Sequence, residues 1–253
     1  MQISLRNKSA WSWFASGKHP IAGDFFKLGA ADALMQAFTD WAESGYRGLM
    51  AGSKPGGGLH SWRFWSRGAK KNLLICGIAR DSCDSLGRPF PLTIIGSGML
   101  RGWESNWDLL PYALEDIWSE VEYLARGRFT DLKQLKEGLD HIKIPSADWR
   151  GLADQRAMVG TMNANQIAGD LHEITEHVQR LLDIGDSIVY LKNVYGADSD
   201  KSAGYWNWAL KAELKIIPNA IFMGGIPDKS YIIVFNRSLN TSDFARLWTI
   251  GAQ

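Results

Sequence analysis

Two histidines that flank an acidic segment are the residues of this sequence whose types most suggest a metal site. They occur in His172-Glu173-Ile174-Thr175-Glu176-His177. The zinc-binding helix of a metalloprotease carries its two histidines four residues apart, so that both side chains face the same ion. Here the spacing is five residues, which turns the second histidine about 140° around a helix. We therefore expect a solvated polar helix face and no metal.

The nucleophilic side chains are poorly placed for catalysis. Ser97 lies between Gly96 and Gly98, whereas a nucleophile elbow needs a glycine two residues to either side of the serine. Cys76 lies inside an apolar segment, which is typical of a small core residue. The two cysteines of the chain are too few for a disulfide framework or a cysteine-rich zinc site. We expect no catalytic residue and no cofactor.

A polar site built from two carboxylates and one arginine is an alternative. Asp24 and Asp84 are the carboxylates best placed for it, and Arg88 follows Asp84 by four residues. Neither aspartate has an identifiable histidine or metal partner, so no acid–base pair is visible in the sequence. An enzyme or a small-ligand binder with a site at Asp24, Asp84 and Arg88 requires these groups to converge on an open pocket.

Aromatic and basic residues interleave over residues 62–71, as they do on a platform for single-stranded nucleic acid. A half-buried strand that enters a basic turn gives the same pattern. Residues 1–100 carry 12 Lys and Arg against 6 Asp and Glu, but the formal net charge of the whole chain is only +1. We therefore favour the structural interpretation and expect no nucleic-acid partner.

Hydrophobic periodicity predicts the elements that must position these residues. Residues of alternating or continuous apolar character predict strands at 11–15, 62–66, 73–79, 92–95, 188–194 and 231–235, and further strands are possible at 206–208 and 220–223. Apolar stripes with a period near 3.6 predict helices at about 30–44, 111–125, 131–139, 167–181 and 243–248.

Helices interspersed with mostly buried strands favour an α/β protein. We expect a single domain over residues 1–253, folded as a layered α/β/α sandwich with a mixed central sheet. The longest apolar run, at 73–79, has seven residues, far short of the ~20 that span a bilayer. We therefore expect a cytoplasmic protein without membrane insertion.

Two stretches of the chain resemble the signatures of the TagF/ImpM family. Gly17-Lys18-His19-Pro20-Ile21-Ala22-Gly23-Asp24-Phe25 is similar to its opening signature, Gly-Lys-x-Pro-x-x-Gly-Asp-Phe after a strand. Asp84-Ser85-Leu86-Gly87-Arg88-Pro89-Phe90-Pro91-Leu92 is similar to its second signature, Asp-x-x-Gly-Arg-x-Phe-Pro-Leu. Trp62-Arg63-Phe64 lies between them, where the family has a Trp-x-Phe strand. The resemblance covers about residues 10–100 and is weak in the C-terminal third.

The two signatures also have an interpretation that does not depend on the family. Gly23 and Gly87 permit tight or left-handed turns, and Asp24 can accept backbone N–H bonds from the next segment. Arg88 can pair with Asp84 or with Asp24, which would lock the two loops together at one edge of the sheet. A direct contact with a ligand or partner is the other role open to these residues. The motif positions are Gly17, Lys18, Pro20, Gly23, Asp24, Phe25, Asp84, Gly87, Arg88, Phe90 and Pro91.

The family resemblance implies an accessory protein of the type VI secretion system. Such proteins act in the cytoplasm as post-translational negative regulators, and some are thought to act through the forkhead-associated (FHA) scaffold protein. No phosphatase domain of the kind fused to some members fits this chain. The resemblance therefore implies protein–protein binding and no enzymatic activity, with an FHA-domain component of the secretion system as the partner.

Twelve tryptophans are more than ordinary composition predicts, and they suggest either an aromatic core or a binding surface. Five of them lie on predicted helix stripes or strands and are expected in the core, namely Trp11, Trp13, Trp41, Trp62 and Trp118. The others leave room for a partner-binding surface, for which the expected residues are Trp65, Trp206 and Trp208.

Overall fold

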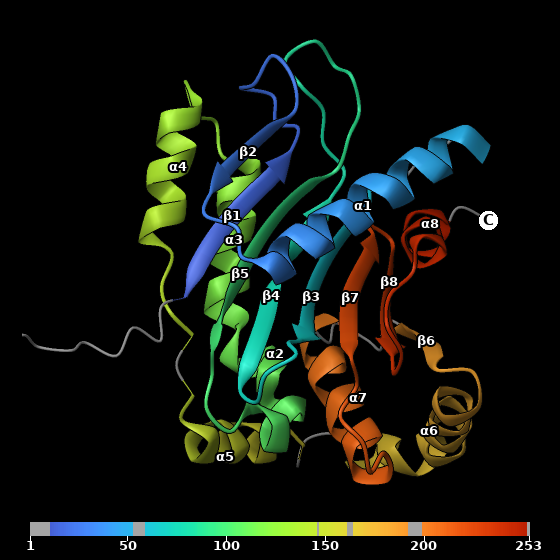
Figure 1. Cartoon of the computed structure of the whole chain (residues 1–253). Helices are drawn as coiled ribbons and strands as arrows, with labels where there is room; N and C mark the ends of the chain where they lie inside the picture. The colour runs from blue at the N-terminus through green and yellow to red at the C-terminus, as the bar shows by residue number, and fades with distance from the viewer. Residues whose placement is uncertain (1–10, 53–58, 146, 161–163, 192–198, 252–253) are drawn as a thin grey trace, which may run out of the picture.

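A single antiparallel sheet forms the centre of the structure, a computed structural model that describes residues 11–52, 59–145, 147–160, 164–191 and 199–251. Within these residues, eight strands pair in the order β2-β1-β5-β4-β3-β7-β8-β6 (Figure 1). The strands are β1 (Ser12–Gly17), β2 (Phe26–Gly29), β3 (Ser61–Arg67), β4 (Leu73–Arg80), β5 (Leu92–Met99), β6 (Asp186–Leu191), β7 (Ala220–Ile226) and β8 (Lys229–Phe235).

The expectation of a mixed sheet was wrong, because every pairing between these strands is antiparallel. Helices between strands suggested the crossovers that parallel pairs need. Instead, most of the helices occur in one long excursion between β5 and β6. The pairs β3–β4, β4–β5 and β7–β8 are consecutive in sequence, and consecutive strands joined by a loop can pair as antiparallel neighbours.

Helices cover both faces of the sheet, so the predicted α/β/α layering is confirmed. α1 (Ala33–Gly52) and α8 (Thr241–Thr249) lie over one face, and α3 (Glu115–Arg126) lies over the other (Figure 1). The remaining helical elements are the 3₁₀ helix η1 (Trp103–Leu109), α2 (Leu110–Ala113), α4 (Leu132–His141), α5 (Trp149–Gly160), α6 (Ala164–Asp183) and α7 (Ser199–Glu213).

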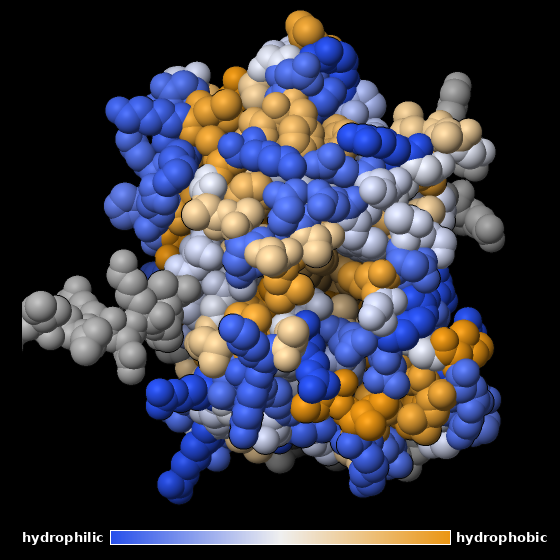
Figure 2. Space-filling view, in the orientation of Figure 1, coloured by the Kyte–Doolittle hydropathy of each residue, from blue (hydrophilic) through white to orange (hydrophobic). Residues whose placement is uncertain are grey.

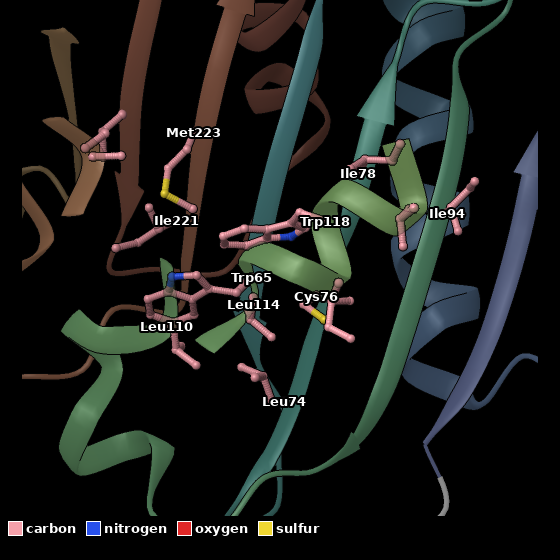
Figure 3. Close-up of a cluster of buried hydrophobic side chains, with 14 of the residues drawn as sticks. Trp65, Leu74, Cys76, Ile78, Ile94, Leu110, Leu114, Trp118, Ile221 and Met223 are labelled. Carbon is pink, nitrogen blue, oxygen red and sulfur yellow. The ribbon is translucent and has the colours of Figure 1, made fainter. Parts of the chain in front are cut away.

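The alternation of side chains along β3 divides the interior into two cores. Trp62 and Phe64 pack on the side of α1 and α8, whereas Trp65 packs on the side of α3, because successive residues of a strand point to opposite faces. Figure 3 shows Trp65 of β3 and Trp118 of α3 among aliphatic side chains on the second side. The five tryptophans expected in the core are all buried, which confirms that prediction.

Residues 192–194 of the strand predicted at 188–194 lie outside the described residues, and two other predicted elements differ from the structure in type or continuity. Residues 206–208 were a possible strand but lie in α7, where the side chain of Asn207 donates to the carbonyl oxygen of Ala203 one turn earlier. The helix predicted at 111–125 is divided at Leu114, whose backbone (φ −105°, ψ −1°) ends α2 and precedes α3. Apolar periodicity continues across this break, so it did not indicate one.

Candidate functional site

Two loops that contain the sequence signatures meet at one end of the sheet. β1 and β5 are antiparallel neighbours, with Ser16 opposite Thr93. The loop that follows β1 and the loop that precedes β5 must therefore lie side by side (Figure 1). The backbone approach is close at Gly17, where φ is +123° and a Cβ atom would overlap the carbonyl oxygen of Pro91. Glycine is required there by both the conformation and the space.

Asp84 is the centre of the contact between the loops, and its side chain is buried. Its Oδ2 atom lies 2.9 Å from Nζ of Lys18 and 2.7 Å from Nε of Arg88. Its Oδ1 atom accepts from the backbone N–H groups of Leu86 and Arg88, both at 3.0 Å. Burial by itself raises the pKa of the Asp84 carboxyl, but the hydrogen bonds from Lys18, Arg88 and Leu86 together lower that pKa well below its usual value.

Arg88 extends from Asp84 across to the first loop. Its Nη2 atom donates to the carbonyl oxygen of Gly23 at 2.8 Å and lies 3.5 Å from Oδ1 of Asp24. A backbone bond from Ser85 to the carbonyl oxygen of Ala22, 2.9 Å long, joins the loops again. The expected pairing of Arg88 with Asp84 and Asp24 is therefore present. We call these two loops, residues 17–25 and 84–91, the clamped loops.

Aromatic side chains connect the clamped loops to α1. The rings of Phe25 and Phe90 meet edge to face with centroids 5.3 Å apart, and the ring of Phe90 contacts Tyr46 of α1 at 4.8 Å. Such edge-to-face pairs add specific geometry to the burial of apolar area. The two signature phenylalanines therefore fix the loops to the helix layer.

The glycines of the two signatures agree with the expectation to different degrees. Gly87 has φ +75°, as a left-handed turn requires, which agrees with the expectation. Gly23 does not have a positive φ, and a Cβ atom there would meet no atom within 4 Å. Of the two possibilities expected for Gly23, a tight or a left-handed turn, the left-handed conformation is therefore wrong. In the first signature, Gly17 is the glycine whose positive φ and close backbone contact exclude a side chain.

His19, at the variable position of the first signature, is buried beneath its loop. Its Nδ1 atom accepts from the backbone N–H of Ile21 at 3.3 Å, and its ring lies 6.0 Å from that of Phe129. Burial lowers the pKa of His19, and the positive charge of Arg80 lowers it further. Both effects favour the neutral form of the imidazole.

The polar groups of the clamped loops are engaged in holding the loops together. Both oxygens of Asp84 accept two hydrogen bonds each, so that carboxylate has no free position for a proton taken from a substrate. Asp24 is exposed at the surface, and its Oδ1 atom accepts from the backbone N–H of Phe25 at 2.8 Å. This geometry disfavours the alternative of a catalytic site at Asp24, Asp84 and Arg88.

A cavity of about 440 Å³ lies near the clamped loops, and none of those three residues lines it. Its walls come from the N-terminal end of β3, the end of β4, α3, α7 and the end of β7. Its polar residues include His60, Arg63, Arg80, Glu122 and Arg126. Arg63 belongs to the segment considered as a nucleic-acid platform, and the other four were not expected at a site from the sequence. The sequence feature that could have indicated this cavity is Arg80, a charged residue at the end of an apolar strand.

Two of the three tryptophans expected at a partner surface are buried. Trp65 is inaccessible in the core on the α3 side, with its ring 5.6 Å from that of Trp103. Trp206 is buried against His177. The expectation of a surface role for Trp65 and Trp206 was wrong, because helices cover both faces of the sheet. Trp208 is 37% exposed and is the one of the three that reaches the surface.

Burial also disfavours a nucleic-acid platform at residues 62–71. Trp62, Phe64 and Trp65 have no accessible surface. Arg63 donates to Glu122 at 2.7 Å and to Glu115 at 2.9 Å. Aromatic rings must be exposed to stack on bases, and basic groups must be available to phosphates. The aromatic side chains of this strand are core residues.

The paired histidines lie on α6, as the periodicity predicted, and point in different directions. His172 is exposed, whereas Nδ1 of His177 lies 2.8 Å from the hydroxyl of the buried Ser187. Among the described residues, no group of three or more His, Cys, Asp and Glu side chains is placed to hold a metal ion.

Cys76 is a core residue, and burial raises the pKa of its thiol. No helix in the described part of the chain is long and apolar enough to cross a membrane.

Comparison with known proteins agrees with the two signatures. A family model for the TagF N-terminal domain, described as type VI secretion system-associated, matches residues 13–142. Among solved structures, the chain is similar to the crystal structure of PA0076 from Pseudomonas aeruginosa PAO1, with a TM-score of 0.54 and 15% sequence identity, over 94% of each chain. At this identity the likeness concerns the fold. No curated protein matches the sequence significantly.

Proposed function

Because the chain belongs to the TagF N-terminal domain family of type VI secretion system-associated proteins, we propose that it represses this secretion system after translation by binding one of its cytoplasmic components. The proposed partner is the FHA-domain scaffold protein. The proposed mode of action is non-enzymatic: the protein holds the partner in an inactive arrangement and does not turn over a substrate.

The observation that supports binding is the construction of the clamped loops. Ion pairs, backbone bonds and aromatic contacts join them to each other and to α1, while their outer side chains remain accessible. Leu86 is 73% exposed at the turn between Asp84 and Arg88, and the side chain of Asp24 is 71% exposed. Figure 2 shows hydrophobic atoms at the end of the molecule where Figure 1 places these loops.

A rigid loop with one apolar and several charged groups is suited to protein recognition. Little conformational entropy is lost when a preorganised loop binds, so more of the contact energy contributes to affinity. An exposed leucine next to the half-exposed Arg88 can provide an apolar anchor and a charged rim. We therefore place the partner contact at Leu86, Asp24 and the outer face of Arg88.

Secretion of the tube protein in the native host tests the regulatory role. Deletion of the gene should increase export, and overexpression should decrease it. Unchanged export in both strains would refute the proposal. Binding is tested by affinity capture of the FHA-domain protein with purified chains carrying Leu86→Ser or Arg88→Ala.

The matched control for Leu86→Ser is Ile144→Ser, which changes another exposed aliphatic side chain outside the clamped loops. We expect Leu86→Ser to lose the partner and Ile144→Ser to retain it, with both variants folded by circular dichroism. Equal capture by the two variants would show that the contact lies elsewhere, and Trp208 would be the next position to change.

A further inference from the structure

The cavity beside the end of β4 combines a cationic wall with an apolar wall. Its volume of about 440 Å³ lies within the range of small-ligand sites. The cationic wall consists of Arg80 and Arg126. The apolar wall includes Leu191, Ala203 and Met223.

Arg80 is a partly buried cation whose hydrogen bonding is incomplete. Its Nη1 atom is out of contact with solvent and has no hydrogen-bond partner among the described residues. An unsatisfied donor on a charged side chain is costly in a protein interior. Burial lowers the pKa of Arg80, and the like charge of Arg126 lowers it further, against the opposing effect of Glu122 and Asp81. The two guanidinium groups therefore interact unfavourably across the cavity wall.

The acidic groups nearby are shared with other donors. Glu122 accepts from Nε of Arg63 at 2.7 Å and from Nη2 of the same residue at 3.3 Å. The distance from Glu122 to Nη2 of Arg126 is 3.9 Å, at the limit of an ion pair. Asp81 accepts from the indole N–H of Trp248 at 2.6 Å and from the backbone N–H of His60 at 2.8 Å.

His60 adds a second polar atom without a partner. Its ring Nδ1 atom lies 3.2 Å from a carboxylate oxygen of Asp81. The Nε2 atom is buried and has no hydrogen-bond partner within the described part of the chain. The same residue lines the cavity. Two different side chains of one cavity thus have buried nitrogen atoms that find no hydrogen-bond partner among the described residues.

We propose that this cavity binds a small amphipathic anion, with a phosphate or carboxylate head group between Arg80 and Arg126 and an apolar body against Leu191 and Met223. An oxyanion satisfies two guanidinium groups at once and removes their mutual repulsion. The cavity is larger than a head group needs, and its apolar wall provides a surface for the rest of the ligand. This ligand site is separate from the proposed partner contact at Leu86.

Calorimetric titration of the whole chain tests the proposal. The probes are phenyl phosphate and benzoate, each with a charged head and an apolar body, together with inorganic phosphate and the uncharged benzyl alcohol, all at constant ionic strength. We expect phenyl phosphate or benzoate to bind at least about tenfold more tightly than inorganic phosphate or benzyl alcohol. Inorganic phosphate lacks the apolar body, and benzyl alcohol lacks the charge-assisted hydrogen bonds. The comparison between the two anions identifies the preferred head group.

Three variants decide whether binding occurs in this cavity. Arg80→Met and Arg126→Gln each remove one positive charge, and each should weaken the better probe by about tenfold or more. The control, Arg47→Met, changes an exposed arginine on α1 that lies outside the cavity, and its affinity should equal that of the wild type.

Absence of saturable binding by both anions would overturn the proposal, as would equal affinities in wild type and Arg126→Gln. If Arg80→Met is unfolded by near-ultraviolet circular dichroism, the largely exposed Arg126 provides the deciding variant. Neither result depends on secretion or on capture of the FHA-domain protein, so this proposal and the proposed function can fail separately.

Discussion

At the level of single residues, Asp84 shows how a buried charge can hold two loops in place. A carboxylate out of solvent is tolerated only when its oxygens are paired and hydrogen-bonded. Lys18 provides one donor from the first loop, and Arg88 provides donors from the second. Loss of either cation leaves Asp84 incompletely paired, so the signature residues depend on one another.

Gly17 and Gly23 provide a matched test of backbone geometry within one signature. Gly17→Ala should destabilise the protein by about 2 kcal/mol or more, because the added Cβ atom overlaps Pro91 and the φ of +123° is strained for alanine. Gly23→Ala should change the free energy of unfolding by less than about 0.5 kcal/mol, since its Cβ atom meets nothing. Urea denaturation of both variants measures the difference. Similar losses at the two sites would contradict the geometry.

His19 makes stability depend on pH in a stated direction. Its pKa is lowered in the folded protein from the ordinary value of 6.5, so the unfolded chain binds more protons near pH 6. The free energy of unfolding should therefore fall as the pH drops below about 6.5. His177, whose pKa is also lowered chiefly by burial, acts in the same direction. In the His19→Gln variant, the decrease in the free energy of unfolding between about pH 7.5 and 5.5 should be smaller than in the wild type. An equal pH dependence of urea denaturation in the two proteins would exclude this role.

At the level of elements, α8 shows how capping and close packing act together. The side chain of Asn240 accepts from the backbone N–H groups of Ser242 and Asp243, and the side chain of Asp243 accepts in return from the Asn240 backbone N–H. This capping box fixes the start of the helix. Phe244, one turn inside α8, then packs against Gly45 of α1. The two helices approach closely because position 45 has no side chain.

Two glycines of α1 should respond oppositely to alanine. Gly48→Ala should stabilise the protein by about 0.5–1 kcal/mol, because the position is exposed and alanine favours the helix. Gly45→Ala has the same propensity gain, but its Cβ atom overlaps the side chain of Phe244. We expect a net destabilisation of about 1–2 kcal/mol from the displaced helix. Thermal denaturation of both variants gives the signs, and stabilisation by Gly45→Ala would contradict the packing of α8 on α1.

At the level of the whole molecule, the C-terminal part completes the sheet begun by the N-terminal part. The family model ends at residue 142, yet β7 pairs with β3 along its length, with Phe222 opposite Phe64. β8 and β6 extend the sheet from β7. Both cores contain residues from both parts of the chain. The sheet and its two cores are therefore larger than the matched segment.

A fragment that ends at residue 142 should not fold as the full chain does. Without β7, the strand β3 becomes an exposed edge that carries Trp62, Phe64 and Trp65, and such edges promote aggregation. We expect the full chain to unfold in one transition, with tryptophan fluorescence and far-ultraviolet circular dichroism in agreement. The fragment should aggregate or show no cooperative transition. A soluble fragment with native-like cooperative unfolding would refute this dependence.

The sequence by itself determined features that arise from neighbours along the chain. The strand at 73–79, the helix capped by Asp131 and the alternation of residues 62–65 follow from local periodicity and capping, and the structure confirms them. The pairing of Arg88 with Asp84 was also accessible, because the two residues are four positions apart. The two signatures are each a short continuous run of residues, and they were sufficient by themselves to indicate the family.

Only the tertiary structure decided which distant segments meet. The antiparallel pairing of β3 with β7 depends on residues more than 150 positions apart, and nothing in either segment specifies its neighbour. Trp65 is buried because α3 and η1 cover the second face of its strand, which the alternating pattern of that strand does not show. The cavity at His60, Arg80 and Arg126 likewise exists only where the ends of β3, β4 and α3 converge. Local physics selects the elements, whereas long-range packing selects their partners and the surfaces that remain available for function.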